Sequence, residues 1–188
     1  MAETIRNITA HIPAARYIAG YMDRERCMAA CLGCGNYGKL WKCPPFDDDF
    51  RETLGRYSSV YLRATVITPE EKGLPLSSVW DMFLKTKPAL EKEMLEMEAD
   101  TGGLALGYAG DCTFCGGMPC RRTYGMPCLH PELVRPSLEA CGFDVCRTAS
   151  EILGTEIKWG KDGMAPEYIT AVSGLFYGRT GPNGSKTI

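Results

Sequence analysis

Eight of the ten cysteines fall into two short clusters, and clustered thiols are the residues of this chain best suited to chemistry. The first cluster has the spacing C-x3-C-x2-C-x8-C and consists of Cys27, Cys31, Cys34 and Cys43. The second has the spacing C-x2-C-x4-C-x7-C and consists of Cys112, Cys115, Cys120 and Cys128. Thiols that only fill a core are scattered along its buried faces, whereas these alternate with Gly, Pro, Lys and Arg. The spacing therefore predicts that all eight thiolates bind metal.

Two kinds of metal centre use four thiolates. A structural zinc site takes four Cys or His ligands, typically as two short hooks separated by a longer loop. An iron–sulfur cubane favours three close cysteines and one more, often next to Pro. Cys43 begins a Cys-Pro-Pro sequence, and Cys120 and Cys128 each follow a Pro. We therefore favour one or two iron–sulfur clusters of the 4Fe–4S type, with zinc as the alternative and ligand exchange between the loops left open.

The residues between the cysteines also suit a cluster. A tetrathiolate cluster carries negative charge, and basic residues of the same loops would offset it: Lys39, Lys42, Arg121 and Arg122. Burial and hydrogen bonding set the potential of a cluster, and aromatic residues would exclude water from it. These aromatic residues are Tyr37, Trp41, Phe46, Phe114 and Tyr124, although for any one taken singly core packing is the better explanation.

The remaining residues that could bind metal are better explained without it. Cys141 and Cys146 are predicted to be ordinary buried thiols. His130 is either a replacement ligand two residues after Cys128 or, as we favour, the start of the next helix. The three aspartates at 47–49 either bind a hard cation or cap a short helix, and capping is favoured.

One spacing match is rejected. Cys27, Cys31 and Cys34 reproduce the C-x3-C-x2-C motif of radical S-adenosylmethionine enzymes, in which three thiolates leave one iron open. That motif belongs in a loop after the first strand of a large α/β barrel. Here a helix is predicted to precede it, 188 residues are too few for the barrel, and Cys43 offers a fourth ligand.

The elements that must position these clusters follow from periodicity and propensity. Helices are predicted at 13–31, 46–57, 79–100, 130–142 and 144–154, the third being kinked or restarted at Pro88. Strands are predicted at 58–68, 103–109, 156–160 and 166–178, the last two being candidates for a hairpin. A helix that continued past residue 31 would place Cys27, Cys31 and Cys34 on one face. The fold class is therefore α+β, with a small mixed β-sheet, flanking helices and two cysteine-rich metal-binding loops.

Length and net charge limit the number of domains and the classes of partner that we expect. A single domain is expected over 1–188, with an N-terminal helix and first cluster (13–50), an α/β core (55–178) carrying the second cluster (110–130), and a loose tail (179–188). The net charge of −2 gives no argument for a nucleic acid or membrane partner. Neither a signal peptide nor a run of roughly 20 apolar residues is present, so we expect a cytoplasmic protein. In that compartment clustered cysteines favour metal over disulfides.

At this level of detail the chain resembles a known family. The runs "CLGCGNYGKLWKCPPF" and "DCTFCGGMPCRRTYGMPCLHPELVRPSLEACGFDV" are similar to an uncharacterised family of prokaryotic proteins, described only as predicted metal-binding proteins under a domain-of-unknown-function label. The similarity extends from about residue 27 to about residue 178. It implies metal-ligating roles for Cys31, Cys34, Cys43, Cys112, Cys115, Cys120 and Cys128. It leaves the role of Cys27 open: with Cys27 the first site has four thiolates, and without it three thiolates and an open position. It implies no reaction.

Three functions are compatible with these residues. We favour an iron–sulfur protein that performs electron transfer with a redox partner enzyme, because no nucleotide or flavin loop is recognisable. The first alternative is a zinc-stabilised interaction module. The second is an enzyme with an open-iron cluster that acts as a Lewis acid or a radical initiator. Catalysis by a Ser-His-Asp set is not supported by a chain with two histidines.

Overall fold

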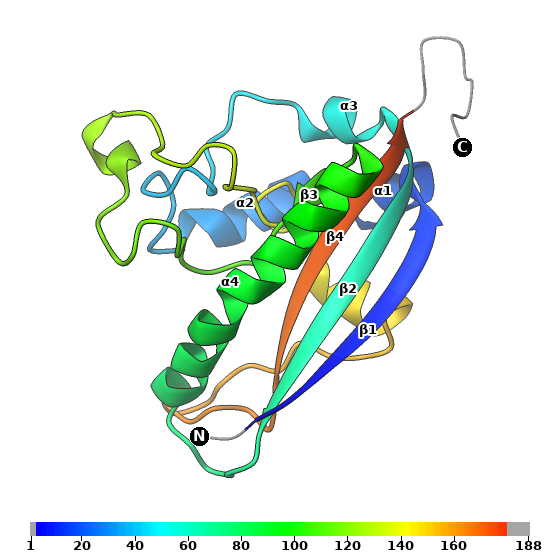
Figure 1. The fold of residues 1–188 in the computed structure, drawn as a ribbon. Helices are drawn as coiled ribbons and strands as arrows, with labels where there is room; N and C mark the ends of the chain where they lie inside the picture. Colours follow the sequence, from blue (N-terminus) through cyan, green and yellow to red (C-terminus); the bar gives the residue numbers. More distant parts are fainter. Residues whose placement is uncertain (1–2, 180–188) are drawn as a thin grey trace.

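A four-stranded antiparallel sheet forms the centre of the protein, and the computed structural model describes residues 3–179. The strand order is β1-β2-β4-β3, as Figure 1 shows. The strands are β1 (Glu3–Pro13), β2 (Tyr57–Pro69), β3 (Leu104–Leu106) and β4 (Ile169–Arg179). The long helix α4 (Leu76–Thr101) crosses one face of this sheet (Figure 1). The opposite face is covered by α1 (Ala14–Tyr21) and the segment that follows residue 137.

Both faces of β2 are buried, because the strand lies between two layers. Val60, Leu62 and Ala64 belong to a cluster that includes Tyr17 and Phe143. On the other face, Ile67 packs in a cluster with residues of α4, such as Phe83, Leu90 and Met94. A strand rich in β-branched residues fits such a doubly covered position. The predicted strand at 58–68 is therefore confirmed.

The first strand was not expected from the sequence. β1 pairs with β2 along its whole length, from Glu3 opposite Pro69 to Pro13 opposite Ser59. Ile8, Ala10 and Ile12 are half-buried and pack against the core, whereas the residues between them are exposed. This alternation with a period of two is the sequence signal for a strand that covers one side of the core.

The predicted helix at 13–31 is two helices. α1 ends at Tyr21, Met22 is extended and forms a bridge to Phe143, and α2 (Arg24–Leu32) begins after Asp23. The carboxylate of Asp23 accepts a hydrogen bond from the Arg26 amide at 3.0 Å and so caps α2. The single-helix prediction is wrong because a capping residue and a distant pairing partner interrupt the chain there.

The next two helices agree more closely with expectation. α3 (Phe50–Leu54) lies inside the predicted helix at 46–57, and the carboxylate of Asp49 accepts from the Arg51 amide at 2.9 Å. The capping interpretation is therefore confirmed for Asp49. α4 begins three residues earlier than predicted and continues through Pro88 as one helix. It ends at Gly102, which adopts the left-handed conformation (φ 61°) that favours glycine.

The C-terminal third departs most from the prediction. Residues 130–142 form turns in place of a helix, and the Gly107 amide donates to the Pro136 carbonyl at 2.8 Å. Residues 144–154 form α5 (Val145–Arg147) and one π-helical turn, η2 (Thr148–Ile152). No strand forms at 156–160, so the predicted hairpin is wrong and β4 pairs with β2 and β3.

The predicted α+β class is confirmed, with helices flanking one small sheet. All three strand ladders are antiparallel, and the parallel pairing in 3–179 is limited to the isolated bridge between Gly107 and Ser137. Within the same residues, none of the helices combines the length and apolar character that crossing a bilayer requires. Of the predicted tail, Arg179 ends β4, and 180–188 lie outside the described residues. The single-domain organisation stays a prediction.

Glu98 connects α4 to two other segments and supports a prediction about pH. Its carboxylate accepts from Arg135 Nε at 2.8 Å and from the Ala105 amide at 2.6 Å. Burial raises the pKa of Glu98, but Arg135 and the Ala105 amide lower it more, so the net pKa lies below its ordinary value of 4.5. We expect Glu98→Gln to reduce the free energy of unfolding by about 1–3 kcal/mol at neutral pH.

The difference in free energy of unfolding between wild type and Glu98→Gln should be fully present above pH 4.5. It should disappear as the pH falls through the lower folded-state pKa of Glu98, because the protonated side chain loses the ion pair. Urea unfolding at several pH values measures both effects. Glu96→Gln is the matched control, since Glu96 is exposed and lies 3.6 Å from Lys92 alone. Equal urea sensitivity of the two variants at neutral pH would contradict the prediction.

Candidate metal centre

The first cysteine cluster lies at the end of α2 and in the loop that follows it. Cys27 and Cys31 are one helical turn apart on α2, which ends at Leu32. Cys34 therefore lies beyond the helix, in a turn whose amide donates to the Cys31 carbonyl at 3.0 Å. The helix does not continue through all three cysteines, which agrees with its predicted end at residue 31. The glycines at 33 and 35 that follow Leu32 explain the end of the helix.

The loop then folds back so that its last cysteine returns toward the first three. The Gly38 amide donates to the Pro44 carbonyl at 2.8 Å, which closes the loop just after Cys43. Gly38 has a positive φ of 70°, a conformation that few other residues adopt. The Asn-Tyr-Gly-Lys and Cys-Pro-Pro sequences thus act together to return Cys43 to the cluster.

Two other thiols of the first cluster raise the pKa of Cys43, so these three thiols lie close together in space. Burial raises the pKa of Cys43 to about 11, Lys42 and Arg122 lower it, and Cys34 and Cys31 raise it further. Burial likewise raises the pKa of Cys31, to which Cys34 also contributes. A metal ion must therefore supply the free energy that keeps these thiols deprotonated.

Cys27 has the least favourable surroundings for a thiolate. Burial raises its pKa to about 12, and the carboxylates of Asp144, Asp23 and Glu139 raise it as well. No basic residue contributes to its pKa in the opposite direction, in contrast to Cys43. Cys27 is thus the weakest of the predicted ligands of the first cluster.

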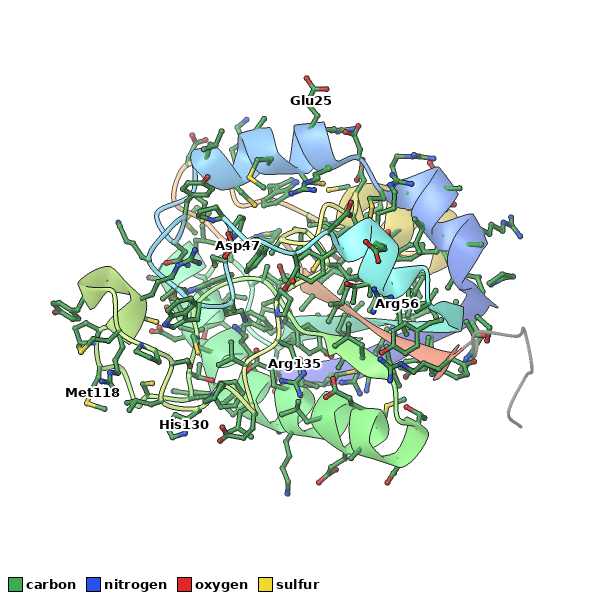
Figure 2. The ribbon with its side chains drawn as sticks, turned by 90° about the horizontal axis from the view of Figure 1, so that it is seen from above. Glu25, Asp47, Arg56, Met118, His130 and Arg135 are labelled. Atoms are coloured by element: carbon green, nitrogen blue, oxygen red, sulfur yellow. The ribbon has the colours of Figure 1, made fainter. Side chains whose placement is uncertain are left out.

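The second cluster lies in the long loop between β3 and Ser137. Cys115 and Cys120 each accept a turn hydrogen bond, from the Met118 amide at 3.2 Å and the Thr123 amide at 3.1 Å. Figure 2 shows Met118 at the outer end of this loop, pointing away from the sheet. Burial raises the pKa of Cys112, which lies at the inner end of the loop. Cys115 and Cys120 therefore lie in backbone turns of the loop, beyond Cys112 at its inner end.

Arg122 joins the two loops. Its guanidinium group donates to the carbonyls of Leu40 at 2.8 Å and Pro45 at 2.6 Å, and also to the carbonyl of Cys43. The same group lies 5.1 Å from the centre of the Trp41 ring, a distance at which cations and aromatic rings attract. Arg122 thus binds the first-loop backbone before, at and after Cys43, a predicted metal ligand.

Two further hydrogen bonds reinforce this connection. The indole nitrogen of Trp41 donates to the Met126 carbonyl at 3.1 Å, and the Asn36 amide donates to the Asp111 carboxylate at 2.9 Å. The loops therefore form one interlocked unit, which is visible beside α2 in Figure 1. Ligands from both loops can contribute to one centre, so the exchange considered from the sequence stays open.

Beneath this unit lies a buried charge network on α4. Lys42, with 3% of its side chain exposed, is 3.2 Å from the Glu91 carboxylate and donates to the Tyr108 carbonyl at 2.8 Å. Lys87, also buried, lies 3.6 Å from the same carboxylate and donates to the Asp111 carbonyl. Burial and the charge of Lys42 lower the pKa of Lys87 to about 7. The network attaches the roots of both loops to one helix.

The sequence analysis missed this network, although it contained a signal. Lys87 and Glu91 lie on the same stripe of α4 as the buried Leu90 and Met94. Charged residues on a buried stripe are almost always paired. The partner, Lys42, lies 49 positions away and had been interpreted only as a charge near the cluster.

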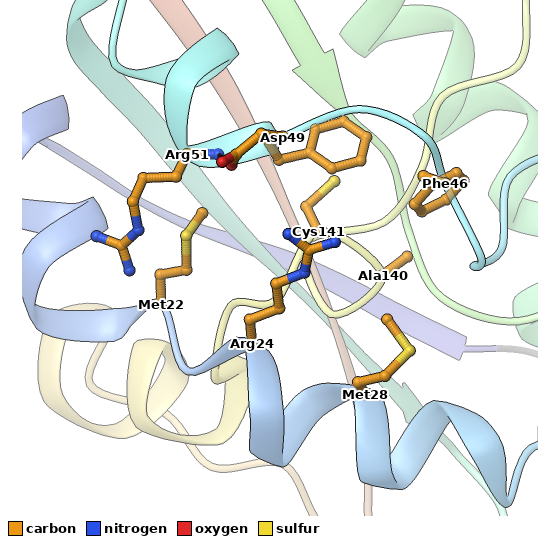
Figure 3. A pocket seen from close by; sticks show the side chains of 9 residues that line it. Met22, Arg24, Met28, Phe46, Asp49, Arg51, Ala140 and Cys141 are labelled. Carbon is orange, nitrogen blue, oxygen red and sulfur yellow. Dashed lines mark hydrogen bonds between the residues drawn. The ribbon is translucent and has the colours of Figure 1, made fainter.

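The two cysteines outside the clusters differ in burial. Cys141 is 4% exposed and borders a small cavity of about 110 Å³ between α2 and α3, next to Met28 and Phe46. Figure 3 shows its side chain pointing into that space, so the prediction of a buried thiol is confirmed. Cys146 is exposed on α5, so the same prediction is wrong for it.

His130 contributes a backbone contact to the second cluster. Its amide donates to Cys128 Sγ at 3.4 Å, while its ring lies 3.9 Å from the Glu132 carboxylate and near the molecular surface (Figure 2). It does not begin a helix, because the next residues form turns after Pro131. An amide directed at a sulfur is the type of hydrogen bond that tunes a thiolate ligand.

The donor set fits a soft metal, since both loops offer thiols flanked by basic residues. Among residues 3–179, however, no three Cys, His, Asp or Glu side chains converge closely enough to hold a single ion. A tetrahedral zinc site needs four ligand atoms at about 2.0–2.3 Å from one point. The thiols thus form a wider arrangement than one such ion requires.

The chain matches one protein-family model, and this match covers most of its length. The model is described as "Predicted metal-binding protein (DUF2284)" and matches residues 11–176. No curated protein and no solved structure is detectably similar to the chain. Metal binding is therefore supported both by the cysteine-rich loops and by the family description.

Proposed function

Because this chain belongs to the DUF2284 family of predicted metal-binding proteins, we propose that its cysteine loops hold iron–sulfur clusters and transfer electrons to or from a partner enzyme. The observation that carries the proposal is the interlocking of two four-thiol loops by Arg122. The ligands are the eight cysteines of the two clusters: Cys27, Cys31, Cys34, Cys43, Cys112, Cys115, Cys120 and Cys128. A bound cluster supplies one-electron transfer.

The arrangement of the sulfurs favours a cluster over a mononuclear zinc site. Cys34 and Cys31 raise the pKa of Cys43, and Cys34 raises that of Cys31, so the three thiols are near neighbours, yet no three donors of residues 3–179 meet at one point. Several irons bridged by sulfide occupy more space than one ion does, so their ligands must be further apart. Lys42 and Arg122 lie beside Cys43 and would offset the negative charge of such a cluster.

The outer face of the second loop suits a docking partner. Met118 and Tyr124 have exposed fractions of 63% and 65%, and both lie within the segment that contains Cys115, Cys120 and Cys128. Exposed apolar side chains beside polar ones are typical of interaction surfaces. Electron transfer requires a short path between centres, and this face brings a partner close to the second cluster.

Elemental analysis tests the proposal directly. Protein purified without oxygen should contain iron and acid-labile sulfide in similar amounts and should show a visible absorption band that weakens on reduction. Stoichiometric zinc without iron would overturn the proposal and would favour a zinc-stabilised interaction module, which should lose its fold on chelation.

Cysteine substitutions assign the centre to its ligands. We expect Cys31→Ala to lose the iron of the first site, because Cys31 is the thiol that influences Cys27, Cys43 and Cys141 together. Cys146→Ala is the matched control, since that thiol is exposed and outside both clusters. Iron and sulfide per chain are the measurement, and equal losses in the two variants would count against the assignment.

A second candidate function is favoured by the surroundings of Cys27. Three carboxylates disfavour its thiolate, so a first site with three thiolates and an open iron is the natural alternative. Such a protein would be an enzyme in which the open position binds substrate. Cys27→Ala separates the two candidates: loss of iron supports the four-thiolate cluster, whereas unchanged iron with an unchanged electron paramagnetic resonance spectrum supports the open one.

A further inference from the structure

A large cavity lies where β3 ends and leaves part of β4 without a neighbour. β3 pairs with β4 only up to Leu106 opposite Gly174, so the residues from Ile169 to Val172 have β2 on one side and the cavity on the other. The volume is about 720 Å³. Sites for small organic ligands and cofactors usually measure roughly 300–1,000 Å³. The cavity is therefore large enough for such a molecule.

The walls are mostly apolar and partly aromatic. Trp80 and Phe83 come from the first half of α4, and their ring centres lie 5.4 Å apart. Trp159, which is 77% exposed, and Ile157 come from the segment before β4. Tryptophan and phenylalanine faces bind flat apolar groups well. A solvent-exposed tryptophan at the edge of a cavity is otherwise costly, because it leaves a large apolar surface in water.

One acidic side chain lines this apolar cavity. Glu139 lies in the turns of residues 130–142, and among the described residues its buried Oε2 atom has no hydrogen-bond partner. Ser137 and the backbone amide of Glu139 itself interact with the carboxyl group. Buried polar atoms are nearly always satisfied, so an orphaned carboxylate oxygen in a ligand-sized cavity indicates a missing donor.

The charges at the rim indicate which kind of ligand fits. Lys158 also lines the cavity, but it is 2.9 Å from the Glu167 carboxylate and lies over the Tyr168 ring at 4.4 Å. Its charge is thus already engaged, and the cavity offers no free cation to an anionic ligand among the residues that line it. A ligand that complements this cavity therefore carries a hydrogen-bond donor, not an acceptor, at the end that reaches Glu139.

We propose that this cavity binds a small organic molecule that has a flat aromatic body and an amine or similar hydrogen-bond donor directed at Glu139. The body stacks among Trp80, Phe83 and Trp159, and the donor satisfies Oε2. This site is separate from the proposed metal ligands, so it does not depend on which metal the loops hold.

The cavity lies close to residues of both cysteine loops. Ala109 lines the cavity three residues before Cys112, the inner cysteine of the second cluster. After burial, Glu139 is the largest influence that raises the pKa of Cys31. The inner end of a bound molecule would therefore lie toward the roots of both cysteine loops.

Three probes with the same aromatic body and different ends test the proposal: biphenylmethylamine, methylbiphenyl and biphenyl carboxylate. Isothermal titration of the purified full-length, metal-loaded protein should show the amine binding about tenfold more tightly than methylbiphenyl, because it gains a charge-assisted hydrogen bond. The carboxylate should bind most weakly. Absence of binding by all three probes, or tightest binding by the carboxylate, would overturn the proposal.

Two variants locate the binding. Glu139→Gln should remove most of the amine's advantage over methylbiphenyl while methylbiphenyl binds as before, and Trp80→Ala should weaken both. Glu132→Gln, an exposed carboxylate of the same segment, is the control and should behave as wild type. Circular dichroism verifies the fold, and Trp80, at the surface, remains an independent variant if Glu139→Gln does not fold. An amine advantage that persists in a folded Glu139→Gln protein would also overturn the proposal.

Discussion

Replacing Glu91 by Gln should reduce the free energy of unfolding by about 3–5 kcal/mol, because it removes the counter-charge of the buried Lys42 and leaves the buried Lys87 amine without its carboxylate partner. Glu91 lies 3.2 Å from Lys42 and 3.6 Å from Lys87, and all three side chains are almost completely buried. Removal of one partner from a buried ion pair is far more damaging than removal of an exposed one. The effect should also reach the loops, since Lys42 neighbours Cys43.

Chemical unfolding of the metal-loaded protein measures this effect, with Glu96→Gln on the exposed face of α4 as the matched control. A second substitution, Lys87→Met, should restore part of the stability in the Glu91→Gln background, because it removes a buried amine that has lost its carboxylate partner. The double-mutant cycle isolates that coupling. A Glu91→Gln protein as stable as the control would show that the network does not support the fold.

Replacing Arg122 by Ala should separate the second loop from the first. Three carbonyl groups of the first loop, at residues 40, 43 and 45, would lose a charged donor. Hydrogen bonds to charged groups contribute about 1.5–3 kcal/mol each, so a combined loss of about 3–5 kcal/mol is expected after allowance for partial replacement by water. Because one acceptor is the carbonyl of Cys43, the metal content should fall as well.

Arg121→Ala provides the control within the same turn, since Arg121 donates only to Met126 Sδ at 3.4 Å. Iron, sulfide and zinc per chain should match wild type in Arg121→Ala and decrease in Arg122→Ala. Thermal unfolding of both variants gives the stability difference. If Arg122→Ala retains its full metal content, the two loops hold their centres independently of each other.

Both predictions concern residues that join segments distant in the sequence. Arg122 contacts Leu40 across 82 positions, and Lys42 contacts Glu91 across 49. Closing such long loops costs conformational entropy, which the contacts at the junction must offset. A metal centre held between the loops would add to the same junction, so stability and metal content should change together.

The sequence by itself determined the features that depend on neighbouring residues. The cysteine spacing identified the two loops, the β-branched run at 58–68 identified β2, and the long periodic segment at 79–100 identified α4. Asp49 was assigned correctly as a cap, because the side chain and the amide it binds are two positions apart. These signals act over one or two turns of chain, and no tertiary contact is needed to interpret them.

Only the tertiary structure decided which residues those elements bring together. β1 exists as a strand because it pairs with β2, from Glu3 opposite Pro69 to Pro13 opposite Ser59, and the interruption at Met22 depends on its bridge to Phe143. The contacts of Arg122 with the first loop, the pairing of Lys42 with Glu91, and the orphaned oxygen of Glu139 beside the cavity had no local signal. A charged side chain has the same intrinsic properties wherever it occurs in the sequence. Its role is set by the dielectric and the partners around it, and these exist only after distant segments have packed.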